Sequence, residues 1–211
     1  MQHFLVAVSA AVLLVGCSEQ VSETATPPDV STSQATADPA TTAVDKARLT
    51  ADAKAAVMEL GMTLKTQLQT AIKSSGPAAA VDVCHKIAPA VAESLSQEHG
   101  VKLTRVSLKN RNPDMGVPSD WQRSVLQDFE ARKAAGESLD KLVYNDVVDG
   151  EHRFMKAIPT QAVCLNCHGV DIKPAVQAKI DEYYPNDRAV GFQEGDIRGA
   201  FVAVRALDGE G

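Results

Sequence analysis

Apolar residues in the first part of the chain recur at the spacing of helices. Residues 45–75 are rich in Ala, Lys, Gln and Glu, and their large apolar side chains recur every four positions (Leu60, Leu64, Leu68 and Ile72). This spacing brings them to one face, so the pattern predicts an amphipathic helix that ends before Gly76 and Pro77.

A second helix is predicted from Pro77, in its first turn, to near Gly100. Its apolar positions follow each other at intervals of three and four residues (Val81, Cys84, Ala88, Val91 and Leu95). Cys84 is therefore expected to face the core, whereas His85 lies about 100° further round the helix. Pro89 removes the hydrogen bond to the carbonyl of His85, so we expect a bend just beyond Cys84.

Beyond Gly100 the apolar pattern changes from helical spacing to alternation. Strands are predicted at residues 101–108, 142–148, 152–158 and 197–207, the middle two joined as a hairpin around Asp149 and Gly150. Helices are predicted at residues 118–135 and 175–182, and a turn at residues 110–116. Helices followed by an antiparallel sheet with one helical interruption indicate an α+β domain.

The N-terminus has the pattern of an export signal. Residues 4–15 form an apolar run that is too short to span a bilayer but suits the centre of a signal peptide. Residues 14–17 (LVGC) resemble the lipobox of bacterial lipoproteins, in which the Cys is acylated and becomes the first residue after cleavage. We therefore predict a signal peptide at residues 1–16 and a lipid anchor on Cys17. The first three residues lack the usual basic side chain, and a plain secretory signal with an incidental Cys is the alternative.

A tether is predicted at residues 17–44, between the anchor and the folded domain at residues 45–211. Ser, Thr, Ala and Pro dominate this segment, and a chain of this kind buries too little apolar surface to offset its ordering entropy. Ser18 after the lipidated Cys resembles the outer-membrane sorting pattern. We expect a domain on the periplasmic side of a bacterial membrane, the outer more than the inner.

The charge of the chain argues against a nucleic-acid partner. The formal net charge is −6, and no long Lys/Arg cluster is present. Because binding to phosphate backbones needs a concentrated basic patch, this class of function is excluded.

The strongest chemical signal is Cys164-Leu165-Asn166-Cys167-His168. Two thiols separated by two residues reach the two vinyl groups of one haem, and the adjacent imidazole binds the iron as proximal ligand. A thioredoxin-like CxxC would follow a strand in a βαβ unit, which the pattern lacks. A structural zinc site would need a second ligand pair, which is also missing. We therefore predict one covalent haem c.

The sixth ligand of the iron must come from upstream, because no Met, His or Cys follows His168. The candidates are Cys84, His85, His99, His152, Met58, Met62, Met115 and Met155.

The roles predicted for the other three cysteines favour Cys84 among these candidates. With Cys17 on lipid and two cysteines on haem, Cys84 is left unpaired in an oxidising compartment, where a free thiol needs a reason. An inert buried Cys is the alternative. His85 is the main rival, although helical phase turns it away from the apolar stripe, and His99 and His152 are expected at the surface.

The chain resembles the PAS-like c-type haem domains, which also occur as extracytoplasmic domains of sensor kinases. The resemblance covers residues 47–207 and rests on five segments in order: 83–89 (VCHKIAP), 109–113 (KNRNP), 164–168 (CLNCH), 184–191 (YPNDRAVG) and 195–200 (GDIRGA).

The resemblance implies a five-stranded antiparallel PAS-like sheet with flanking N-terminal helices and a CxxCH haem loop. It also implies an unusual axial pair, a helix Cys and the CxxCH His, which correspond here to Cys84 and His168. His85 follows the Cys where a small polar residue is expected, so His85 stays an alternative ligand. No kinase is appended, so a signalling output would need a partner.

These features favour a membrane-anchored module that senses redox state or a small ligand such as a diatomic gas. A periplasmic lipoprotein electron carrier with a redox partner protein is the alternative, although thiolate donation lowers the reduction potential. A peroxidase-like enzyme needs an open iron site, which a sixth ligand blocks, so we expect no enzymatic activity. Arg188 and Arg198 are candidate partners of the haem propionates, and the Arg-Asn-Pro segment is expected to be a structural turn.

Overall fold

The apolar spacing of the first part of the chain forms long helices that pack side by side. The structure, a computed structural model, describes residues 39–207. Helix α1 (Pro39–Asp82) begins before the predicted Asp45, inside the segment expected as a tether, and non-helical backbone at Gly76 (φ 80°) interrupts it where the first predicted helix ends. The signal peptide, Cys17 and the rest of the tether lie outside the described residues.

The bend predicted beyond Cys84 takes the form of a π-helix. This segment, η1 (Val83–Ile87), separates α1 from α2 (Ala88–His99), and Pro89 stands in the first turn of α2. Since Pro89 offers no N–H, the preceding turn widens instead of continuing the regular ladder. Gly100 then ends α2 in a left-handed conformation (φ 60°), as its sequence position predicts.

Four antiparallel strands form one sheet in the order β1-β4-β3-β2. They are β1 (Lys102–Val106), β2 (Val143–Val148), β3 (Glu151–Pro159) and β4 (Ile197–Ala206). All four were predicted from the sequence, the last because its residues are apolar on both faces, and the β2–β3 hairpin turns at Asp149 and Gly150 as expected. The described residues contain four strands rather than the five that the resemblance implied.

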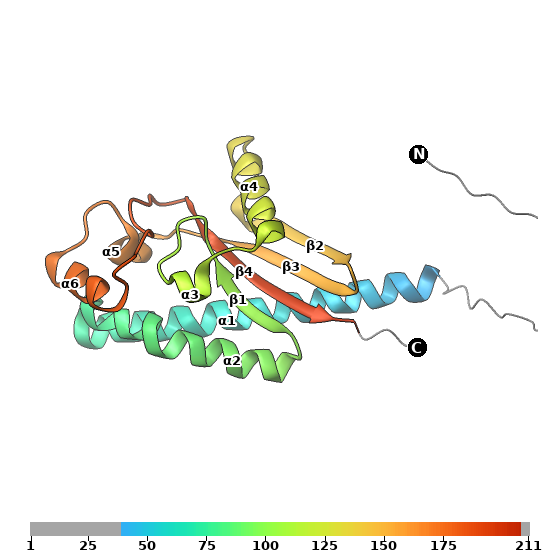
Figure 1. Ribbon diagram of the computed structural model, residues 1–211, viewed down its shortest axis with the longest axis horizontal. Helices are drawn as coiled ribbons and strands as arrows, with labels where there is room; N and C mark the ends of the chain where they lie inside the picture. Colours follow the sequence, from blue (N-terminus) through green and yellow to red (C-terminus); the bar gives the residue numbers. More distant parts are fainter. Residues whose placement is uncertain (1–38, 208–211) are drawn as a thin grey trace, which may run out of the picture. The chain divides into compact units, whose positions relative to one another are not determined.

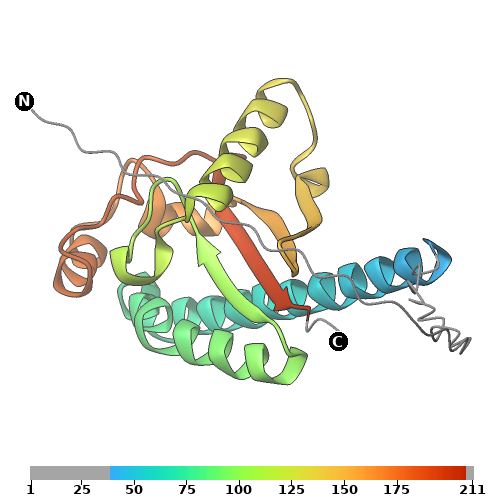
Figure 2. The ribbon, with the colours of Figure 1, turned by 45° about the vertical axis from the view of Figure 1, so that its right-hand side comes forward.

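Helices cover both faces of the sheet. Figures 1 and 2 show α1 and α2 side by side along one face and α4 (Asp120–Ala134) on the other. We call the first the open face and the second the closed face. The core of the closed face contains Phe129, Leu142 and Met155, none of which is exposed. On the open face, Leu60 of α1 packs with Phe154 of β3, in the neighbouring core cluster.

Short helices carry the loops at one end of the sheet. They are α3 (Pro113–Gly116), η2 (Leu139–Lys141), η3 (Ala162–Cys164), α5 (Leu165–His168) and α6 (Pro174–Tyr183). The segment 164–168, expected as a loop, is thus the end of a 3-10 turn followed by a single helical turn, and part of the expected turn at 110–116 is helix α3. No helix within residues 39–207 is long and apolar enough to cross a bilayer.

Candidate functional site

A cavity of about 480 Å³ lies between the helix pair and the open face of the sheet. Its volume is within the range of small-molecule sites, ~300–1000 Å³. Apolar side chains from both layers form most of its wall. The thiol, imidazole, phenol and cationic residues that line it are Cys84, Cys164, Cys167, His168, Tyr184, Lys65, Arg105, Arg111, Lys156 and Arg198.

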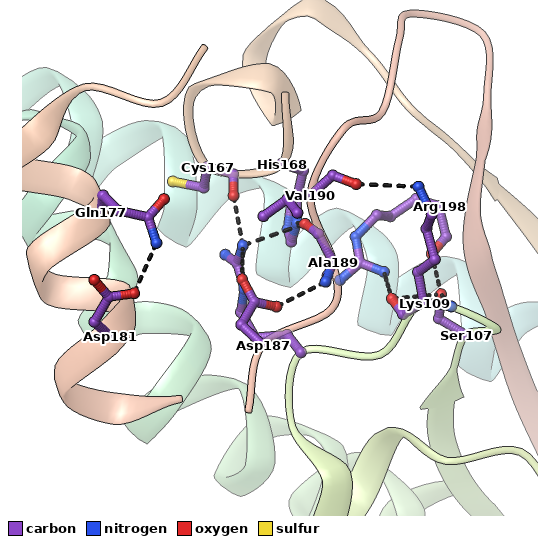
Figure 3. A network of polar contacts seen from close by, with 11 residues as sticks. Ser107, Lys109, Cys167, His168, Gln177, Asp181, Asp187, Ala189, Val190 and Arg198 are labelled. Atoms are coloured by element: carbon purple, nitrogen blue, oxygen red, sulfur yellow. Dashed lines mark hydrogen bonds and ion pairs between the residues drawn. The ribbon is translucent and has the colours of Figure 1, made fainter. Parts of the chain in front are cut away.

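His168 ends α5 and contributes its ring to this cavity. The Nδ1 atom lies 2.8 Å from the carbonyl oxygen of Ala189, which fixes the proton on Nδ1 and leaves the lone pair on Nε2. Burial lowers the pKa of His168 well below its usual range, and Arg198 and Arg111 lower it further. The ring is therefore neutral at pH 7, with the carbonyl contact that metal-binding histidines use to fix their orientation. Figure 3 shows His168 beside Ala189.

The two thiols of the motif line the same cavity as His168. Cys164 closes η3 and accepts a hydrogen bond on Sγ from the backbone N–H of Gln161 (3.4 Å). Cys167 lies within α5, and burial raises the pKa of its thiol to about 11. Both cysteines are free of disulfide bonds, as is Cys84. Each thiol is therefore available for a covalent bond to a group bound in the cavity.

Cys84 also lines the cavity, and His85 does not. Cys84 is half-buried in the π-helix η1 and borders the cavity, as helical phase predicted. The ring of His85 instead stacks on Tyr183 of α6, with centroids 4.2 Å apart and planes 7° from parallel. Its edge also meets the ring of Tyr184. Of these two neighbouring candidates, Cys84 therefore lies at the cavity and His85 lies against α6.

Polar contacts hold the π-helix against α6. The hydroxyl of Tyr183 donates a hydrogen bond to Asp82 (2.6 Å), and Lys86 forms an ion pair with the same carboxylate (3.0 Å). The bond from Tyr183 and then that from Lys86 lower the pKa of Asp82. Together with the ring of His85 on Tyr183, these contacts fix both ends of the turn that carries Cys84.

The other candidate ligands divide into two groups. Met58, Met62 and Met115 line the cavity and are exposed, so they stand at its mouth. The remaining three, Met155, His99 and His152, do not line it.

The surface position expected for His152 is wrong, because this side chain is 1% exposed. It lies on β3 and contacts the side-chain oxygen of Asn145 through Nε2 (2.7 Å). The polar partner on the neighbouring strand explains why a histidine is tolerated inside the sheet packing. His99 contacts Glu59 (2.9 Å) and is partly exposed.

A buried ion pair, which the sequence analysis did not identify, supports the CxxCH segment at residues 164–168. Arg111 and Asp187 are 2.9 Å apart, and both side chains are less than a tenth exposed. Arg111 also donates to the carbonyl of Cys167, and Asp187 accepts from the backbone N–H of Ala189 (2.8 Å). Ala189 in turn accepts from His168. The Arg-Asn-Pro segment, expected to be a plain turn, therefore positions the CxxCH segment. The sequence did offer one indication of this contact, because residues 109–113 and 184–191 are both among the segments that carry the resemblance.

The two arginines proposed for propionates differ in position. Arg198 of β4 lines the cavity, and its guanidinium lies over the ring of Phe192. Arg188 is exposed and does not line the cavity. Figure 3 shows Arg198 beside Lys109 and Ser107.

These residues fit a covalently attached haem. The cavity combines an apolar wall, two free thiols at CxxC spacing and a neutral imidazole whose Nδ1 is already bonded. A porphyrin needs the first, thioether attachment the second and iron ligation the third. No cluster of three or more His, Cys, Asp or Glu that would hold a bare metal ion occurs in the part of the chain that the structure describes.

Comparisons with known proteins find a family and a solved heme protein that are similar to this chain. A model of the Tll0287-like family matches residues 34–204. Among solved structures, the crystal structure of the cyanobacterial heme-protein Tll0287 is similar, with a TM-score of 0.55 and 25% sequence identity. The similarity covers 82% of this chain and 98% of that one. No curated protein sequence matches.

Proposed function

The chain belongs to the Tll0287-like family, and we propose that it is a c-type haem protein with one haem attached to Cys164 and Cys167. The observation that carries this proposal is that both thiols and His168 line one apolar cavity. The heme named for the structural relative supports the same cofactor. When bound, haem supplies one-electron redox chemistry and an iron that takes axial ligands.

In this proposal His168 is the proximal ligand. Its bond to the Ala189 carbonyl holds the ring in one tautomer and strengthens the donor nitrogen, Nε2. The Arg111–Asp187 pair supports both the carbonyl of Cys167 and the segment that holds His168. Loss of this pair would therefore loosen the motif without removing any ligand.

Cys84 is the proposed distal ligand. It borders the cavity on the helix wall, whereas His85 is held on Tyr183. A thiol is an iron ligand as thiolate, and the charge of the metal stabilises that form. His85 is the alternative only if the stack on Tyr183 opens.

We further propose that the domain is exported, anchored through Cys17 and used to sense redox state or a small ligand. The support is the lipobox-like pattern at residues 14–17 and the thiolate–imidazole pair inferred for the iron. Cys84 and His168 would hold the iron, and the ligand chemistry of that iron would supply the response to redox state or to a small ligand. An electron carrier is the second candidate, favoured by the cavity's opening at exposed Met58, Met62 and Met115.

The decisive experiment is to produce the chain in a bacterial host that matures c-type cytochromes. We expect an alkaline pyridine haemochrome spectrum of the thioether type and a protein mass increased by one haem. The Cys164→Ala/Cys167→Ala variant should lose the covalent mass. A colourless wild-type protein of unmodified polypeptide mass would contradict the proposal.

The distal ligand is tested by a matched pair of neighbours. Ferric Cys84→Ser should lose the low-spin thiolate spectrum, whereas His85→Phe, which keeps an aromatic ring on Tyr183, should retain it. The reverse result would make His85 the ligand. Binding of CO or NO at measurable rates would favour sensing, and fast reduction by a periplasmic cytochrome would favour electron transfer.

A further inference from the structure

The charged residues that line the cavity are all cations, whereas the chain as a whole is acidic. The chain has a net charge of −6. Among the described residues, however, the cavity is lined by the cations Lys65, Arg105, Arg111, Lys156 and Arg198 and by no Asp or Glu. Like charges gathered beside an apolar wall repel one another, and burial removes the water that would screen them. A bound anion would offset this repulsion.

Arg198 is the cation that most needs such an anion. Its Nε atom is buried without a hydrogen-bond partner, and one amino group donates to the carbonyl of Lys109 (3.3 Å). No carboxylate of the described residues lies within 4.0 Å of it. Burial lowers its pKa to about 10, and the nearby Arg111 and Arg105 add to this effect. A half-buried guanidinium whose Nε donor is unused is a candidate site for a carboxylate.

The other cations are distinguished by their partners. Arg111 is already paired with Asp187, and Lys156 donates to the carbonyl of Asp140 (2.9 Å). Arg105 and Lys65 are exposed at the cavity's edge. Arg105 lies on β1 opposite Phe201, two residues along β4 from Gly199 and close enough to Arg198 to lower its pKa. Of the three arginines that line the cavity, Arg198 and Arg105 are therefore the two available to bind an anion there.

Resting on the proposed function, we propose that Arg198 binds a propionate carboxylate of the haem, with Arg105 as the second cation of the same subsite. Haem carries two propionates, so it brings the anionic charge that the cavity lacks. Arg188, which is exposed and outside the cavity, has no part in this subsite.

The test compares haem-loaded Arg198→Gln with Arg188→Gln as the matched control. Removing the positive charge beside the haem favours the ferric form. We expect the reduction equilibrium of Arg198→Gln to shift about tenfold toward ferric, which is about 59 mV for one electron. Arg105→Gln should give a smaller shift in the same direction, and Arg198→Lys should recover part of the loss. Arg188→Gln should match wild type.

A second readout detects the carboxylate contact itself. In the resonance Raman spectrum, the propionate bending modes should move in Arg198→Gln and stay unchanged in Arg188→Gln. A haem-loaded Arg198→Gln with wild-type potential and wild-type propionate modes would overturn the assignment of Arg198 and leave the haem proposal standing. Failure of the wild-type chain to acquire haem would overturn the haem proposal itself.

Discussion

The two faces of the sheet are built from the same strands but are packed differently. On the closed face, side chains of α4 and of the strands form a buried core, in which Phe129, Leu142 and Met155 have no exposed surface. On the open face, Leu60 and Phe154 fill one end, and the space at the other end remains as the cavity. One face of the sheet therefore stabilises the fold, and the other combines stability with a binding site.

Side-chain size explains where the packing of the open face stops. Beyond Phe154, the next same-face positions of β3 are Lys156 and Ile158, which face Phe201 and Gly199 on β4. A Cβ at Gly199 would lie 2.3 Å from the carbonyl oxygen of Val106, so no larger residue fits there. Gly199 has no side chain for this reason, and residues 199 and 201 both line the cavity.

The largest expected effect comes from truncating the closed face. Phe129→Ala should lower the free energy of unfolding by about 3–5 kcal/mol, because it leaves a cavity in a filled core. Phe201→Ala on the open face should cost less, since its ring is partly exposed. Urea unfolding of the haem-loaded variants measures both. Equal losses would show that the open face is packed as tightly as the closed one.

A smaller effect tests the one buried histidine of the sheet. Burial lowers the pKa of His152, so below pH 6.5 the unfolded chain takes up a proton that the folded chain excludes. Neutral His152 makes its full contribution to the free energy of unfolding at pH values above the histidine pKa of the unfolded chain. This contribution is lost as the pH falls toward the lower pKa of His152 in the folded protein. The loss amounts to at most about 1.4 kcal/mol per pH unit.

The measurement is urea unfolding of wild type and His152→Gln at pH 7.5 and pH 5.5 (roughly one unit either side of the histidine pKa of ~6.5). The stability difference between the two proteins should shrink at the lower pH. His99→Gln, at a partly exposed histidine, is the control for general effects of removing an imidazole. A difference that is independent of pH would mean that His152 titrates equally in both states.

The smallest effect is expected at the mouth of the cavity. Met62 is 61% exposed, so Met62→Leu should change the free energy of unfolding by no more than about 0.5 kcal/mol. The ferric spectrum should also stay unchanged, because Cys84 is the proposed ligand. A spectral change in Met62→Leu, with Cys84→Ser unchanged, would transfer the distal position to the methionine at the open edge.

Local periodicity determined the elements of this chain. The four-residue spacing from Leu60 to Ile72 predicted the first helix up to Gly76. Short apolar patterns predicted the four strands, the last from a run that is apolar on both faces. The spacing of the motif and the apolar stripe of the second helix singled out Cys164, Cys167, His168 and Cys84, which the fold brings to one cavity. These patterns can be recognised in the sequence alone because each depends on residues that are only a few positions apart.

Only the tertiary structure decided the contacts between distant segments. The pair of Arg111 and Asp187, the burial of His152, the stack of His85 on Tyr183 and the exposure of Arg188 all depend on side chains brought together from separate elements. The helical period gives a direction for a side chain, but it does not say what lies in that direction. Packing between elements decides which charged and aromatic side chains become partners. The sequence therefore named the candidate ligands but not the residues that hold them in place.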